Sequence, residues 1–372
     1  MDTVFPFGFP GPTAFYLTLL VAVFMIHVLF MNYVLAGSAY LAAHTVLFGS
    51  ADDGTPLSRI LRDWLPFMLS AAITAGIAPL LFLQIVYREN FYTANLLLFY
   101  RWMAILPVLI AGFYLLYILK SKRIGHWPFV ARAAVGVGAF AGFMFVAWSW
   151  VENHLLSVHP DVWVEQYASG VLVYRPFELF PRLALWVVGS FPTMALMLAW
   201  QVWWESRLDT GMPTAEQTRG AHRTAMIALI AIVLTSICAG AYSLLMPPAA
   251  RDVVFSMLTL PYVILSVIGV TLELIAWVPQ LRAGRLKLVW LSVATVGLML
   301  HFCGMTVINE STRLAAIDIS TRYAEHAASA KIGGRWAFGF FLLLNLGLMA
   351  YCIRLTSMRR PPEETIETPE KP

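Results

Sequence analysis

Charged residues are scarce in this chain. Asp, Glu, Lys and Arg make up 12% of its 372 residues, against roughly 25% in an ordinary soluble domain. Hydrophobic residues make up 59%, and the mean hydropathy is +0.72. This composition excludes a water-soluble globular fold and predicts a polytopic membrane protein. The net charge of +4 is modest, and we expect a lipid bilayer rather than a nucleic acid as the partner.

Cysteine is also rare. Cys238, Cys303 and Cys352 lie singly in apolar segments and show no paired spacing. This argues against a disulfide, a zinc site and a cysteine-bound iron–sulfur cluster. The chain has no CxxCH motif, so a covalently attached c-type haem is excluded. It also shows no internal repeat, which disfavours an inverted-repeat transporter.

Apolar stretches long enough to cross a bilayer, about 20 residues each, occur nine times. We predict an all-α bundle of nine transmembrane helices at 12–46, 64–87, 97–119, 128–154, 181–204, 223–246, 253–281, 286–309 and 334–357. The first stretch lacks a basic start and a small-residue cleavage site, so we expect a retained span. Residues 1–357 form a single transmembrane domain in this interpretation. The polar, proline-rich residues 358–372 are expected to be a disordered cytoplasmic tail.

The basic residues predict an orientation. With the N-terminus outside, sixteen of the 25 lysines and arginines fall on the inner side and nine on the outer side. The positive-inside rule therefore favours an outer N-terminus and an inner C-terminus. We expect a multi-pass protein of a bacterial inner membrane.

Three histidine or acidic residues lie two or more helical turns inside predicted spans. At 1.5 Å per residue, His27 is about 20 Å from the outer end of its helix, and His301 is about 12 Å from the outer end of the eighth span. Glu273 is about 12 Å from the inner end of the seventh span. Such groups cost at least ~2.5 kcal/mol each at membrane depth, so a functional role is the first hypothesis.

Each of these residues has two interpretations. His27 is either an axial ligand of a haem iron or a histidine hydrogen-bonded to a neighbouring helix through Asn32 or Tyr33. His301 is a candidate second ligand. Met246, Met299 and Met305 are alternatives to it, because methionine also binds haem iron. Glu273 is either a proton relay or a neutral acid in an interhelical hydrogen bond.

Polar residues also gather at the predicted outer ends of the spans. This group forms either an interfacial belt of charged and aromatic residues or a docking surface and redox-site rim facing the periplasm. Its members are Gln84, Tyr87, Arg88, Glu152, His154, His159, Glu178, Arg182, Glu310 and Arg313.

Several segments resemble subunit I of the cytochrome bd quinol oxidases. "FMIHVLFMNYVLAGSAYLA" is similar to the first helix of that family, which carries a haem-ligand histidine. "ITAGIAPLLFLQIVYRENFYTANLL" is similar to the second helix and the loop after it. "FVAWSWVENHLLSVHPDVW" and "YRPFELFPRLALWVVGSF" resemble the fourth and fifth helices. The resemblance covers roughly the first 200 residues. It implies a b-type haem bound by His27, with quinone as a possible further cofactor.

The chain also departs from that family. The family's fifth helix has a histidine near its start, where this chain reads "PRLALW". The family's third helix carries glutamates for protons, and "FYRWMAILPVLIAGFYLLYIL" has none. The long quinol-binding loop after the sixth helix is replaced by "MPPAARD". We therefore expect a shortened, divergent relative that does not reduce dioxygen.

Three functions remain open from the sequence. The first is a redox subunit that moves electrons between the quinone pool and a periplasmic c-type cytochrome, as part of an oxidoreductase complex. The second is a haem-free membrane anchor for a multisubunit respiratory or electron-transfer complex. The third is a transporter that uses Glu273 as its proton-coupled acid.

Overall fold

The described part of the chain is predominantly helical. A computed structural model describes residues 8–49, 55–207, 212–331 and 334–358, and it contains no strand within those ranges. The predicted tail, residues 358–372, lies outside the described residues except for Met358. The all-α prediction is therefore confirmed.

The prediction of nine long apolar helices is also confirmed for the described residues. By length and composition each could cross a membrane, so the protein is a multi-pass membrane protein. The helices are α1 (Gly11–Phe48), α2 (Pro56–Val86), α4 (Phe99–Lys120), α5 (Phe129–Val158), α7 (Leu179–Glu205), α8 (Thr214–Leu245), α10 (Leu260–Ala283), α11 (Leu288–Ala316) and α13 (Gly334–Met358).

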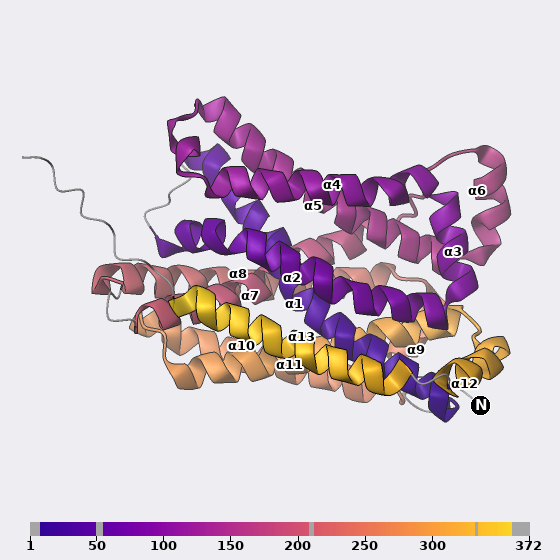
Figure 1. The fold of residues 1–372 in the computed structure, drawn as a ribbon. Coiled ribbons are helices and arrows are strands. Elements are labelled where there is room, and N and C mark those ends of the chain that lie inside the picture. The colour runs from indigo at the N-terminus through magenta and orange to yellow at the C-terminus, as the bar shows by residue number, and fades with distance from the viewer. Residues whose placement is uncertain (1–7, 50–54, 208–211, 332–333, 359–372) are drawn as a thin grey trace, which may run out of the picture.

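Short helices connect the long ones. Four of them gather at the end of the bundle where α1 begins (Figure 1): α3 (Arg88–Leu97), α6 (Trp163–Ser169), α9 (Pro248–Val254) and α12 (Tyr323–Lys331). We call this the α1-start end. The 3-10 turns η2 (Pro160–Val162) and η3 (Ser320–Arg322) precede α6 and α12, and η1 (Lys122–His126) follows α4. Because the long helices alternate in direction, the predicted outer residues all fall at the α1-start end.

Local signals explain several helix ends. Pro56 occupies the first turn of α2, and the side chain of Thr55 accepts a hydrogen bond from the backbone N–H of Leu57. This cap places the start of α2 eight residues before the predicted one. Gly49 and Gly284 adopt positive φ and end α1 and α10, as glycine does at helix C-termini.

Helix α1 is central to the packing. It contacts α2, α5, α7, α11 and α12, and consecutive pairs α4–α5, α7–α8 and α10–α11 pack closely as antiparallel hairpins. Large apolar side chains of α4, α8, α10 and α13 face outward, as lipid contact requires. Helix α13 runs along the outside of the bundle (Figure 1) and buries no residue of its apolar window.

Candidate functional site

A cavity of about 850 Å³ opens within the bundle toward the α1-start end. Its walls come from α1, α5, α7, α8, α9, α10 and α11, and most of the lining is apolar. Phe255 and Val267 lie at its edge and are more than half exposed, so the cavity is open on the side of α10. Its size falls in the range of ~300–1,000 Å³ that is typical of small-molecule sites.

His301 lines this cavity at its deep end. Its Nδ1 is 2.8 Å from the hydroxyl oxygen of Ser266 on α10, and its Nε2 makes no hydrogen bond to the described residues. An imidazole held at Nδ1 with Nε2 free is the usual arrangement of a histidine that binds a metal. Since α11 continues to Ala316, His301 lies about 22 Å from the helix end rather than the predicted 12 Å.

Glycines bring the backbone of α10 against that of α11 beside His301. A Cβ added at Gly269 would lie 2.5 Å from the backbone nitrogen of His301, and one added at Gly297 would lie 2.7 Å from the carbonyl oxygen of Gly269. The helices therefore touch backbone to backbone, as small residues allow in membrane proteins. This contact fixes the backbone position of His301.

Two of the three candidate methionines share the cavity with His301. Met246, the C-cap of α8, is 9% exposed and lines the wall, and Met305 lines it one turn after His301. Met299 is not among the lining residues. The thioethers of Met246 and Met305 are thus the ones that can reach a group bound in the cavity.

His27 lies outside the cavity lining, against α2. Its Nδ1 is 2.9 Å from the carbonyl oxygen of Ala72, and its ring packs on Gly76, where an added Cβ would lie 2.9 Å from Cε1. Asn32 and Tyr33, the predicted alternative partners, instead donate to Thr193 and Gln201 of α7. The Nε2 of His27 makes no hydrogen bond within the described ranges, so its role as a ligand stays a prediction.

Glu273 is buried in α10 on the side that faces α11. It is 2% exposed, and its Oε2 has no hydrogen-bond partner among the described residues. Trp277 Nε1 and Gln280 Oε1, on the same helix face at i+4 and i+7, are buried and lack partners in the same way. Such a column of unsatisfied polar atoms is typical of a place that holds ordered water.

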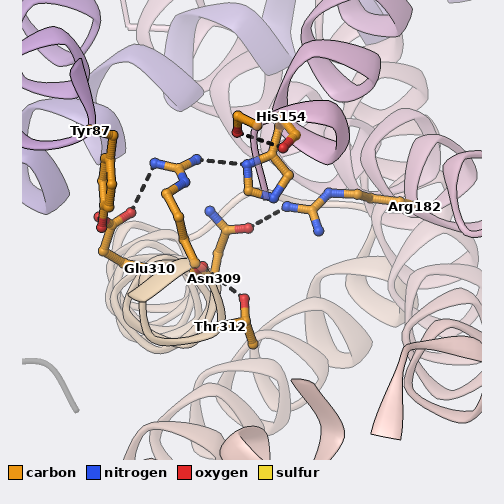
Figure 2. A network of polar contacts seen from close by, with 8 residues as sticks. Tyr87, His154, Arg182, Asn309, Glu310 and Thr312 are labelled. Atoms are coloured by element: carbon orange, nitrogen blue, oxygen red, sulfur yellow. Dashed lines mark hydrogen bonds and ion pairs between the residues drawn. The ribbon is translucent and has the colours of Figure 1, made fainter. Parts of the chain in front are cut away.

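A buried polar network joins α5, α11 and the junction of α2 with α3 at the α1-start end (Figure 2). The hydroxyl of Tyr87 donates to Glu310, which pairs with Arg313 at 3.1 Å. Arg313 also donates to Nδ1 of His154 at 3.0 Å. Because a guanidinium can only donate, Nδ1 of His154 is an acceptor and its Nε2 carries the proton. Burial and the charge of Glu310 raise the pKa of Tyr87 well above its usual value, which keeps the phenol a donor.

Arg182 begins a second branch of this network. Its guanidinium donates to the hydroxyl of Tyr242 at 2.7 Å and to the side-chain oxygen of Asn309. Arg182, His154, Asn309 and Arg313 all line the cavity. The network therefore forms the polar end of the same cavity that has His301 at its deep end.

The other predicted rim residues lie apart from this network. Glu152 is fully buried, pairs with Arg101 at 2.8 Å and accepts the backbone N–H of Tyr174. Glu178 lines the cavity and lies 3.7 Å from Nε2 of His159. Burial, Glu178 and Asp161 raise the pKa of Tyr174 to about 12. Gln84 is half-buried and Arg88 is exposed.

Sequence reasoning missed several partners of these residues. Arg101, Tyr242, Ser266 and Asn309 were not singled out, although each is a polar residue within an apolar span or at its end. A count of such residues finds the candidates, but the pairing depends on how each helix is rotated. That rotation is a property of the folded bundle.

Metal-ligating side chains are not clustered in the described ranges. No group of three or more His, Cys, Asp or Glu that could hold a metal ion occurs in the part of the chain that the structure describes. A metal at His301 would therefore need ligands from a bound group. No family model matches this chain, and no curated protein matches it.

Proposed function

We propose that this protein is a membrane redox subunit that binds a b-type haem in the cavity. In this proposal it moves electrons between the quinone pool and a periplasmic c-type cytochrome, in a bacterial inner membrane with the α1-start end outside. One observation carries the proposal: the half-buried imidazole of His301, in an apolar cavity of about 850 Å³, is fixed at Nδ1 and makes no hydrogen bond at Nε2 to the described residues.

The residues of the cavity fit a haem in chemical type. His301 supplies an imidazole nitrogen, Met246 and Met305 supply thioethers, and apolar walls suit a macrocycle. Arg182 and His154 offer donors at the polar end. A bound haem supplies one-electron chemistry. The chain's own contribution is to hold and orient the group, and Ser266 fixes the His301 ring for that purpose.

His27 remains a further candidate ligand in this proposal. Its ring is anchored to the backbone of α2 at Nδ1, and its distance from the α1-start end, about 24 Å, is close to that of His301. A quinone would occupy an apolar cleft of the same bundle. Glu273 is proposed as a proton relay, and the unpartnered polar atoms of Trp277 and Gln280 beside it support a hydrated path.

An optical spectrum and a haem assay of the purified protein test the proposal. We expect a reduced-minus-oxidised b-type band that is lost in His301→Ala. It should be kept in the control His222→Ala, whose histidine is exposed at the start of α8. His27→Ala measures whether the second histidine also holds haem. A colourless wild-type protein, or unchanged haem content in both His301→Ala and His27→Ala, would overturn the assignment.

A haem-free anchor subunit is the alternative, and one observation favours it. Val164 and Tyr167 of α6 are each 81% exposed at the α1-start end, and such apolar side chains outside the long helices suit contact with another subunit. A colourless protein that purifies with a further subunit would support this function instead.

A further inference from the structure

Arg182 is unusual among the buried arginines. Three arginines are buried in the described ranges: Arg182, Arg313 and Arg322. Arg313 pairs with Glu310 at 3.1 Å, and Arg322 pairs with Glu325 at 2.6 Å and with Glu89 at 3.5 Å. Arg182 is 7% exposed and forms no ion pair with any carboxylate among the described residues. Buried charges in proteins are normally paired.

The contacts of Arg182 provide hydrogen-bond acceptors for its guanidinium but no negative charge to pair with it. Its two terminal nitrogens donate to Tyr242 and Asn309, which are both neutral. Its Nε is buried without an acceptor. The guanidinium thus carries an unneutralised positive charge into the wall of the cavity.

Two further donor groups belong to residues that line the cavity beside Arg182. His154 accepts from Arg313 at Nδ1, so its Nε2–H is a donor, and no described residue accepts from it. Asn309 presents its side-chain oxygen to Arg182, so its NH₂ group is also left as a donor. Figure 2 shows the Arg182 guanidinium beside His154 and Asn309, and all three residues line the cavity.

The acidic residues of the cavity do not supply the missing charge. Glu178 lies 3.7 Å from Nε2 of His159 and makes no ion pair with Arg182, although it is only one helical turn away. Asp161 lines the cavity but is exposed. The polar end therefore presents one unpaired cation and two neutral donors next to apolar walls.

We propose that the cavity binds an amphipathic anion, with a carboxylate or phosphate group at Arg182, His154 Nε2–H and Asn309, and an apolar body along the walls formed by α8, α10 and α11. A haem carboxylate and the phosphate of an anionic phospholipid offer this same chemistry. The inference depends on the charge of the cavity and not on the haem, so it can hold even where the proposed redox function fails.

Binding of oleate and of its methyl ester to the protein in neutral detergent tests the charge requirement. We expect the acid to bind at least about tenfold more tightly than the ester, a difference of about 1.4 kcal/mol. Arg182→Gln should abolish this preference, and Arg182→Lys should retain it. Arg88→Gln, which changes an exposed arginine outside the cavity, should behave like the wild type.

Equal binding of acid and ester to the wild type would overturn the inference, as would a full acid preference in Arg182→Gln. If Arg182→Gln does not fold, the wild type and Arg182→Lys still test the inference. It is refuted if the wild type shows no preference for the acid, or if Arg182→Lys loses the preference that the wild type shows.

Analysis of the molecules that copurify identifies the source of the anion. Phospholipids and haem are extracted and quantified from the wild type, Arg182→Gln and Arg88→Gln. Loss of an anionic phospholipid in Arg182→Gln alone assigns the site to a lipid, and loss of haem alone assigns it to haem carboxylates. A lipid-bearing, haem-free wild type would support this inference and reject the redox function. A copurified amphiphile present equally in all three proteins would count against the site.

Discussion

The contact between α10 and α11 gives a quantitative prediction. In Gly269→Ala the new methyl carbon would lie 2.5 Å from both the carbonyl oxygen of Gly297 and the backbone nitrogen of His301. Ordinary contact begins at 3.4 Å, so the shortfall is about 0.9 Å, the difference of these two values. Both contacted atoms are backbone atoms, which cannot rotate away as a side chain can. The two helices must therefore separate.

The expected cost follows from this geometry. Overpacking costs typically ~1–3 kcal/mol, and a clash with backbone belongs at the upper end of that range. Alanine in place of glycine returns about 1 kcal/mol through helix propensity. We expect Gly269→Ala to lower the free energy of unfolding by roughly 2 kcal/mol and to displace the ring of His301 from Ser266.

Unfolding by SDS in mixed micelles, followed by circular dichroism, measures this change. Gly347→Ala in α13 is the matched control, because its methyl group would meet nothing within 4 Å. We expect the control to be neutral or slightly stabilised. If Gly269→Ala is as stable as Gly347→Ala, α10 and α11 do not approach as closely as the structure shows, and the position of His301 derived from that contact is also wrong.

Two further predictions concern buried polar groups. Arg101→Leu leaves the fully buried Glu152 unpaired and should lower the free energy of unfolding by about 3–5 kcal/mol in the same SDS titration. The double variant Arg101→Leu/Glu152→Gln should recover most of this stability. A double variant as unstable as Arg101→Leu would contradict the pairing. Burial lowers the pKa of His326 below 6.5. At low pH, His326 therefore takes up a proton more readily when α12 is undocked than when it is docked. The docked α12 contacts α1 through Nδ1 of His326 and the hydroxyl of Thr13. This docking should be strongest above pH 6.5 and weaken below it. The pH dependence of amide hydrogen exchange in Tyr323–Lys331, corrected for the intrinsic exchange rate, measures this docking. The same pH dependence in His326→Gln would refute the role of His326.

The long helices were predictable because each needs only an apolar run of sufficient length. The sequence prediction failed at the end of α11, where it stopped at residue 309 and the helix continues to Ala316. Hydropathy falls at "NESTR", so a span looks finished there. In the folded protein Glu310 and Arg313 pair with each other and with Tyr87 and His154, so the charges are accommodated within the bundle.

The candidate site was predictable only in its residue types. An ionisable residue in an apolar span can be found from sequence, and this identified His27, His301 and Glu273. Which of them lines a cavity depends on helix rotation. The structure turns His301 toward the cavity and His27 toward Ala72 and Gly76. Small residues on the neighbouring helix are a weak sequence signal for such a contact, because they occur throughout membrane helices.

The cavity's two polar features set a minimum size for a ligand that uses both. His301 and Asn309 are separated by eight residues of α11, or about 12 Å along the helix axis. A free inorganic anion could satisfy Arg182 but would leave the His301 imidazole unused. A purely apolar molecule could fill the deep end but would leave the Arg182 charge unpaired. One molecule can serve both ends only if it carries an acidic group on an apolar body of at least about this length. An imidazole bonded only at Nδ1 at one end and an unpaired cation at the other therefore favour a large amphipathic ligand over a small ion.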